Sequence, residues 1–294
     1  MNTNNRIDFQ RPDLHELARS HTVMDMHLHS RHSDGLNTVR AIARRAHRLG
    51  IGVAITDHNA IAGAVEIDRD PNLLSIPGIE VTSVEGSHLL IYFYDVKSLG
   101  RFYESNVKPF MGSGLMSSLS LDMETIIERA RRYRSVVIFP HPYCAAYTGV
   151  CNLQFPEDRL NRLLALVDGV EVINAGNLNR WNMQCAVLGF NLDKAITGGS
   201  DGHALGHIGR AVTYFSGDAG RKAFLDAIIE KRVKVMGKEM NFFRKVTTNG
   251  SKLRPNLRYY PDLMEKNIRY GYSFINSKSK RLKENVRRSF NGKA

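Results

Sequence analysis

The sequence contains little that would anchor it in a membrane or cross-link it covalently. No apolar run approaches the roughly 20 residues needed to span a bilayer, and the longest runs are short, such as residues 89–94. The three cysteines, Cys144, Cys151 and Cys185, form no Cys-x-x-Cys pair. Residues 1–5 lack the apolar core of a signal peptide. These absences exclude a disulfide framework and predict a protein of the reducing cytoplasm.

The positive charge is concentrated in the last part of the chain. Residues 241–294 contain 14 Lys and Arg against 3 Asp and Glu, whereas the whole chain has 41 against 29. Residues 1–240 therefore carry 27 against 26 and are nearly neutral. We expect a main unit at 1–240 and a basic, aromatic-rich extension at 241–294. The extension suits contact with nucleic acid, packing or oligomerisation, or an acidic lipid surface.

The main unit alternates short apolar strands with helical patterns, and it lacks a Gly-rich dinucleotide turn. This alternation favours a parallel sheet closed, or nearly closed, into a barrel. Residues 98–120 break the rhythm and predict a loop or small insertion over the barrel mouth, serving either as a lid or as a surface excursion. Strands are predicted at 23–27, 51–56, 73–81, 88–94, 135–139, 169–173, 194–197, 210–215 and 233–236. Helices are predicted at 38–49, 121–133, 158–167, 180–188 and 220–230.

Potential metal ligands occur at the ends of these strands. His27 and His29 have the i, i+2 spacing that places two side chains on the same side of a strand, and Asp34 follows in a Ser-Asp-Gly turn. Functional groups of α/β barrels gather at the carboxyl ends of strands. The complete set contains six of the 11 histidines and consists of His27, His29, Asp34, His58, Glu80, His88, His141, Asp201 and His203.

In their order, the motifs that contain these residues resemble those of the PHP (polymerase and histidinol phosphatase) family. They are Asp-Met-His-Leu-His-Ser at 25–30, Ser-Asp-Gly at 33–35, Ile-Thr-Asp-His at 55–58, Gly-Ile-Glu at 78–80, His-Pro at 141–142 and Gly-Ser-Asp-Gly-His at 199–203. The resemblance covers residues 23–215 and is closest to the stand-alone phosphoesterases that act on nucleotides and RNA ends. It departs at Asn59, where relatives commonly carry Asp.

The resemblance implies a distorted (β/α)7 TIM-like barrel with up to three metal ions. His27, His29, Glu80 and Asp201 would hold one ion. Glu80 would bridge to a second ion completed by His88 and His141, and the third would be held by Asp34, His58 and His203. The position of His88 depends on the register of the loop at 82–87.

Such a site suits hydrolysis of phosphate esters. Adjacent divalent ions lower the pKa of a bridging water, which gives a hydroxide nucleophile, and they neutralise phosphate oxygens. Imidazole and carboxylate ligands favour Mn, Zn or Fe. The expected cofactors are therefore two or three divalent ions of these types.

Further polar residues flank the motifs. Asp57 is either a residue that orients His29 or His58 or simply a turn residue, and Asn174 either faces the pocket or serves a turn. The candidates for contact with substrate phosphate, which otherwise are solvent-facing, are Arg31, His32, His207 and Arg210.

The leading hypothesis is a metal-dependent phosphoesterase acting on nucleotides or on RNA or DNA ends. One alternative is a small-molecule phosphatase of the histidinol-phosphate type, although that group usually has His where this chain has Asp34. The other is a non-enzymatic metal-binding module that associates with nucleic acid, against which the intact set of nine ligands argues.

Overall fold

The computed structural model describes residues 6–114, 117–144 and 149–240. The basic extension predicted at 241–294 lies outside these residues. Within the described part, no helix is long and apolar enough to cross a membrane.

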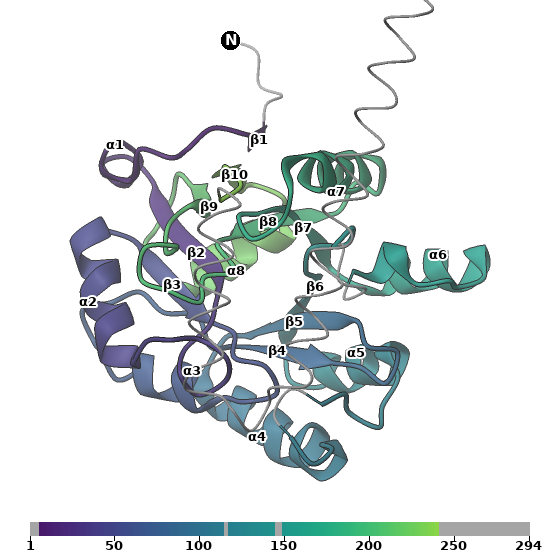
Figure 1. Ribbon diagram of the computed structural model, residues 1–294. Helices are drawn as coiled ribbons and strands as arrows, with labels where there is room; N and C mark the ends of the chain where they lie inside the picture. Colours follow the sequence, from purple (N-terminus) through teal and green to yellow (C-terminus); the bar gives the residue numbers. More distant parts are fainter. Residues whose placement is uncertain (1–5, 115–116, 145–148, 241–294) are drawn as a thin grey trace, which may run out of the picture.

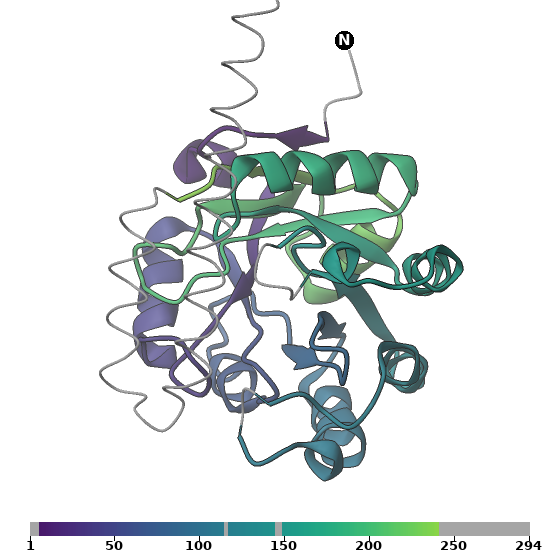
Figure 2. The same cartoon turned by 45° about the vertical axis from the view of Figure 1, so that its right-hand side comes forward.

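Ten strands form two five-stranded sheets in the described residues, with helices arranged around them (Figures 1 and 2). The first sheet has the order β1 (Ile7–Asp8), β10 (Lys234–Gly237), β9 (Ala211–Phe215), β2 (Thr22–Leu28) and β3 (Gly52–Ile55). The second has the order β4 (Gly78–Thr82), β5 (His88–Phe93), β6 (Ser135–Phe139), β7 (Gly169–Asn174) and β8 (Ala195–Gly199). The helices are α1 (Leu14–Ala18), α2 (Val39–Leu49), α3 (Ala62–Ile67), α4 (Val96–Asn106), α5 (Met123–Arg131), α6 (Glu157–Leu166), α7 (Asn179–Asn191) and α8 (Arg221–Ile229), with short 3-10 turns η1 (Lys108–Phe110) and η2 (Val150–Asn152).

The sheets are mixed, which corrects the expectation of a parallel sheet. Strand β2 pairs in parallel with β3, and β7 pairs in parallel with β6 and β8. However, β5 is antiparallel to both β4 and β6, and β9 is antiparallel to both β2 and β10. The short turn between Thr82 and His88 explains the first antiparallel pair, because two adjacent strands joined by a few residues must reverse direction.

The two sheets approach each other at two seams. Leu28 at the end of β2 forms a parallel bridge with Gly202 after β8, and His58 after β3 forms one with Glu80 in β4. The amide of Asp201 also donates to the carbonyl of His27 at 2.7 Å. The mixed α/β class is thus confirmed, but the strand pairing forms two sheets, and the closed TIM-like barrel is not confirmed. Both seams contain predicted ligands.

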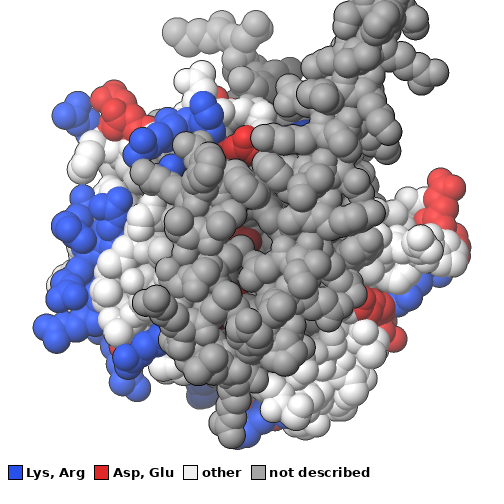
Figure 3. Space-filling model, in the orientation of Figure 1, with Lys and Arg blue, Asp and Glu red and all other residues white. Residues whose placement is uncertain are grey.

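Helix α2 shows how local sequence fixes an element. The Thr38 side chain caps it by accepting from the amide of Ala41, and Gly50 ends it in the left-handed region with φ of 67°. Val39 and Ile42 are buried against the sheet, whereas the outward face is basic. In the space-filling view, the Lys and Arg side chains along the left edge lie over α2 (Figure 3).

Two predicted segments were wrong, and the short elements β1, α1 and α3 were not predicted. The loop expected at 98–120 begins with nine residues of α4, which is capped by Asp95 and buries Leu99 and Phe102. The strand expected at 73–81 starts only at Gly78, and α3 was not predicted. Helix α3 has only six residues, Ala-Gly-Ala-Val-Glu-Ile, which are too few to show helical periodicity, and this explains why it was missed.

Candidate metal centre

The carboxylate of Glu80 lies at the centre of a buried group of imidazoles. Its Oε1 is 2.7 Å from His88 Nδ1 and 3.4 Å from His141 Nε2. Its Oε2 is 3.3 Å from both His27 Nε2 and His58 Nδ1, and 3.4 Å from His29 Nε2. One carboxylate from β4 therefore contacts ligand candidates from four other chain segments.

A second group of contacts surrounds Asp201 and Asp34. Asp201 Oδ1 lies 3.2 Å from His29 Nε2 and 3.7 Å from both His27 Nε2 and His203 Nδ1. Asp34 Oδ2 is 2.9 Å from His203 Nε2, and its Oδ1 is 3.7 Å from His29 Nδ1. His29 belongs to both groups, so the structure brings all nine predicted ligands into one continuous cluster.

The position of His88 follows from the register of β4 and β5. Thr82 stands directly opposite His88 in this antiparallel pair. Side chains at i and i+2 share a face, so Glu80 and His88 lie on the same side of the sheet. The turn at 82–87 is fixed by a bond from the Ser83 amide to the Ser87 carbonyl and by Gly86 at φ of 81°.

The cluster fits divalent metal ions. His27, His29 and Glu80 are at most 1% exposed. Both ring nitrogens of His29, Nδ1 of His58 and Oε1 of Glu80 are buried without a hydrogen-bond partner in the described residues. Nitrogens and oxygens that share a four- to six-coordinate ion at about 2.1 Å lie about 3 to 3.5 Å apart. The separations around Glu80 and Asp201 fall mostly in that range, and buried polar atoms without partners are costly unless a ligand satisfies them.

The grouping of the ligand atoms differs in part from the expected partition. Four groups of three residues place their ligand atoms within 4.8 Å of one another: His27, His29 and Asp201; His27, Glu80 and His141; His29, Asp34 and His203; and His29, His58 and Glu80. The first contains three of the four residues expected for the first ion, without Glu80, and in the second His27 takes the place of His88 beside Glu80 and His141. In the others, His58 groups with Glu80 instead of Asp34, and His29 joins Asp34 and His203.

The electrostatics of the cluster favour bound positive charge. Burial opposes ionisation of Glu80, but His58, His88 and His27 outweigh it and hold the pKa of this carboxyl well below its usual range. Burial likewise opposes ionisation of Asp201, and contacts with His27 and His29 again keep its pKa well below the ordinary value. Burial holds the pKa of His58 well below its ordinary value, whereas at His27 the contacts with Glu171 and Glu80 outweigh burial and raise the pKa well above it. Deprotonated carboxylates and a neutral imidazole are the ligand forms that a metal requires.

Glu171 in β7 contacts two of these histidines, His27 and His141, and is not one of the site residues predicted from the sequence. Its Oε1 lies 3.0 Å from His27 Nδ1, and its Oε2 accepts from the amide of His141 at 3.0 Å and from Asn174 Nδ2 at 2.9 Å. Because a carboxylate only accepts, His27 donates from Nδ1 to Glu171, and its Nε2 faces Glu80 Oε2 at 3.3 Å. The sequence signal that could have indicated this role is the single carboxylate of Glu171 inside an otherwise apolar strand.

Asp57 acts on the loop after β2, which is the turn role among the two roles left open for it. Its Oδ1 accepts from the Ser30 amide at 2.7 Å and from Ser33 Oγ at 2.7 Å, and its Oδ2 accepts from Ser30 Oγ at 2.6 Å. These bonds fix the turn that carries Asp34. Asn174 faces the cluster, which is one of the two roles left open for it, and donates to Asp201 Oδ2 at 3.4 Å as well as to Glu171.

The candidates for phosphate contact lie in different environments. Arg31 is exposed, whereas His32 is half-buried with its Nε2 3.2 Å from Glu66. His207 is buried, and Arg210 donates from Nε to the Gly206 carbonyl at 3.0 Å. Of these four side chains, the exposed Arg31 is the one best placed to reach a phosphate from solvent.

Two ligand candidates have backbones in the left-handed region, His141 with φ of 33° and Asp201 with φ of 49°. Such conformations are uncommon for non-glycine residues and cluster at functional sites. Asn59, at the position where relatives commonly carry Asp, has φ of 45°. Its side chain donates to the Ser117 carbonyl at 2.8 Å and accepts from the Thr82 amide at 3.1 Å.

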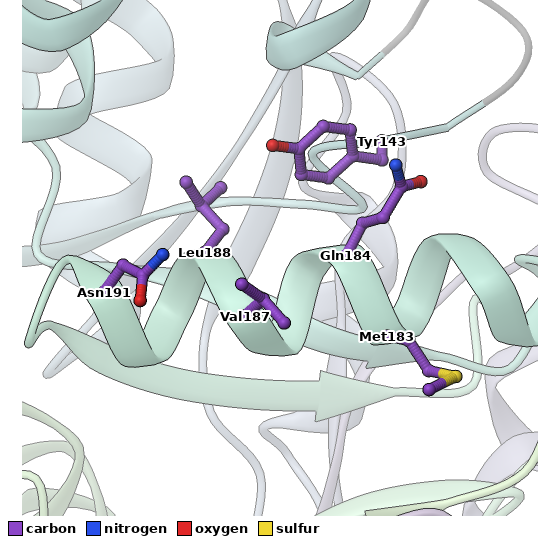
Figure 4. A pocket seen from close by; sticks show the side chains of 6 residues that line it. All are labelled: Tyr143, Met183, Gln184, Val187, Leu188 and Asn191. Atoms are coloured by element: carbon purple, nitrogen blue, oxygen red, sulfur yellow. The ribbon is translucent and has the colours of Figure 1, made fainter.

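A separate pocket of about 280 Å³ lies on the outside of α7 (Figure 4). The ring of Tyr143 covers one side, and the other lining residues come from α7: Met183, Gln184, Val187, Leu188 and Asn191. None is an acid or a histidine, so this pocket offers no ligand set comparable to the cluster around Glu80.

Comparison with protein families agrees with this geometry. A PHP domain model matches residues 25–167, and a PHP-associated model matches residues 179–233. These two segments contain all nine clustered residues. The chain belongs to the PHP family. It is accordingly a hydrolase that acts on phosphoric ester bonds, and the resemblance inferred from the motifs is confirmed.

This PHP protein is similar to several proteins at low sequence identity. Uncharacterized protein MJ1587 of Methanocaldococcus jannaschii is 27% identical over 166 residues, which cover 51% of this chain and 81% of that protein. A two-domain protein of Bacteroides vulgatus with a predicted PHP-like metal-dependent phosphoesterase is 17% identical, with a TM-score of 0.56 over 83% of this chain and 73% of that one. Endonuclease Q, crystallised with a 27-mer duplex carrying an abasic lesion, is 19% identical, with a TM-score of 0.60 over 74% of this chain and 60% of that one. The Bacteroides vulgatus protein and endonuclease Q thus share the fold of this chain.

Proposed function

We propose that this PHP protein hydrolyses phosphate esters of nucleotides or of RNA or DNA ends, using two or three divalent ions of Mn, Zn or Fe. The proposed ligands are the nine clustered residues. The observation that carries the proposal is the contact of one buried carboxylate, Glu80, with five imidazoles at 2.7 to 3.4 Å. A structural role for so many buried titratable groups would leave several without hydrogen bonds, which is unfavourable.

Bound ions would supply Lewis-acid charge, lowering the pKa of a coordinated water and neutralising phosphate oxygens. The chain supplies the geometry. Glu171 holds His27 and His141 in place, and Asp57 holds the turn that carries Asp34. These outer contacts keep the ligand atoms aimed at the cluster before substrate arrives, which lowers the reorganisation needed during the reaction. Arg31 is exposed on the Asp34 loop, where its guanidinium suits a phosphate.

Two features support a nucleotide or nucleic-acid substrate. The fold is shared with endonuclease Q, whose crystal structure contains a DNA duplex with a lesion at the active site. The chain also has 14 Lys and Arg against 3 Asp and Glu in residues 241–294. We propose that residues 1–240 form the phosphoesterase unit and that the basic extension contacts the substrate's phosphates.

A substrate panel tests this proposal. The full-length protein, loaded with Mn²⁺, is assayed for phosphate release from a 3′,5′-bisphosphonucleotide, a short 5′-phosphorylated RNA and histidinol phosphate. We expect release from the first two. The Asp201→Asn and His58→Gln variants should lose about 10²-fold or more of this activity, whereas the controls Asp218→Asn and His15→Gln, at exposed positions, should retain it.

Turnover of histidinol phosphate alone would replace the proposed substrate with a small-molecule ester. Equal activity of Asp201→Asn and Asp218→Asn would show that the cluster is not the active site. Absence of hydrolysis despite stoichiometric metal would favour the non-enzymatic alternative.

A further inference from the structure

Helix α2 carries a row of arginines on its outward face. Arg40, Arg44 and Arg48 are all exposed and are separated by four residues each, so they follow one line along the helix. At 1.5 Å per residue the row is about 12 Å long. The Lys and Arg surface on the left edge of Figure 3 lies over this helix.

The three arginines form no ion pair with any residue in the described part of the chain. Arg48 donates only to the backbone carbonyl of Arg44, at 3.4 Å. Two acids of the neighbouring segment face histidines instead: Glu66 in α3 lies 3.2 Å from His32, and Asp70 after α3 lies 2.8 Å from His47. Five arginines on other elements do form ion pairs with acids: Arg19, Arg159, Arg162, Arg221 and Arg232.

This arrangement costs stability in the isolated protein. Like charges at i and i+4 destabilise a helix by roughly 0.2 to 0.5 kcal/mol per pair. Arg40 also stands in the first turn, where the helix dipole disfavours a cation, and α2 has no acidic residue to compensate. Residues 1–240 are nearly neutral, with 27 basic against 26 acidic residues, so the row is a local feature of the surface. An external polyanion would remove the repulsion.

The helix that carries the row directly follows a loop of the candidate metal centre. The loop between β2 and α2 carries Asp34, and the Leu36 amide in this loop donates to the His203 carbonyl at 2.9 Å. The exposed Arg31 belongs to the same loop, whose backbone is closed by a bond from Arg31 to Asn37 at 2.9 Å. A chain of phosphates that has one ester at the metal centre can therefore continue over Arg31 onto α2.

We propose that Arg40, Arg44 and Arg48 bind the sugar–phosphate backbone of a polynucleotide whose reacting phosphate lies at the metal centre. This inference rests on the proposed function and narrows its substrate class from nucleotides to nucleic-acid strands. About 12 Å of one strand carries three or four phosphates at 3.4 Å each along the axis, so the row matches about three contacts. The contacts are independent of base sequence.

The test is the salt dependence of binding. A mixed-sequence single-stranded DNA oligonucleotide with a fluorescent label is titrated with the full-length protein at several salt concentrations. The variant Arg40→Gln/Arg44→Gln/Arg48→Gln is compared with Lys97→Gln/Arg132→Gln/Lys234→Gln, which removes equal charge from exposed positions on other elements. Loss of three phosphate contacts should reduce the slope of log K against log salt by about 2. The control should change it by less than half as much.

Equal changes in the two triple variants, or none in the α2 variant, would overturn the inference. Selective loss of binding to phosphatidylserine vesicles, with oligonucleotide binding unchanged, would assign the row to a lipid surface and also overturn it. Turnover of a 3′,5′-bisphosphonucleotide should be unchanged in the α2 variant, because that substrate is too short to reach the row. If no protein hydrolyses any ester but the slope falls as expected, the proposed function fails and the binding surface stands.

Discussion

Replacing Glu171 by glutamine should weaken metal binding although Glu171 is not itself expected to hold a metal. The side chain is 1% exposed, and its two oxygens accept from His27 Nδ1, the His141 amide and Asn174 Nδ2 at 2.9 to 3.0 Å. Glutamine has one oxygen and one NH₂ group. Whichever way it turns, the NH₂ group faces a donor, either the ring of His27 or the amide of His141.

The size of the effect follows from these contacts. One buried donor left without an acceptor costs roughly 1 to 3 kcal/mol of stability. His27 also loses the carboxylate that fixes its tautomer, and such outer contacts are worth about 10- to 100-fold in metal affinity. We therefore expect Glu171→Gln to have a lower unfolding midpoint and a Mn²⁺ or Zn²⁺ dissociation constant raised by about 10- to 100-fold.

The assay is competition with a chelating dye, at a temperature where both proteins are folded. The matched control is Glu128→Gln, on the exposed side of α5. A purely structural role for Glu171 would lower the unfolding midpoint and leave the metal affinity of the folded protein at its wild-type value. That outcome would refute the assigned function of the Glu171 contacts.

Two further substitutions test the packing around the cluster. In Gly199→Ala, the added Cβ would lie 2.3 Å from Cβ of His27, so we expect denaturant unfolding to show a loss of several kcal/mol of stability. In the control Gly100→Ala, the added Cβ meets nothing within 4 Å, and α4 should gain about 0.5 to 1 kcal/mol. Equal effects of the two substitutions would contradict the close approach of β8 to β2. In Asn59→Asp, the carboxylate cannot donate to the Ser117 carbonyl, so we expect a loss of about 1 kcal/mol and faster amide exchange near residue 117, and unchanged exchange would contradict the bond.

The sequence allowed the cluster members to be predicted because short motifs and a family resemblance identify them one by one. The nine residues do lie together, and their role as metal ligands remains a prediction. Which ligands share an ion was less predictable: His58 groups with Glu80 because a bridge joins the ends of β3 and β4, a pairing between sheets that local patterns do not encode. For Asp57 the sequence left open whether it orients an imidazole or serves a turn, and its bonds to Ser30 and Ser33 show the turn role.

The direction of the strands was the other feature that the sequence did not predict correctly. Alternation of strands and helices predicts parallel pairing, but β4 and β5 are joined by a short turn, and β9 inserts antiparallel between β2 and β10. Periodicity reports burial and not the direction of a neighbouring strand. Glu171 illustrates the same point at the scale of one residue, since its partners His27 and His141 are distant in the sequence.

The most direct test of the account is the metal content of the purified full-length protein. After exposure to Mn²⁺, Zn²⁺ and Fe²⁺ and removal of free ions, elemental analysis should find two or three divalent ions per chain, held through a chelator wash. Asp201→Asn and His58→Gln should each lower this number, whereas Asp218→Asn should not. A protein that retains no stoichiometric ion after this treatment would contradict the central claim that the cluster around Glu80 is a metal centre.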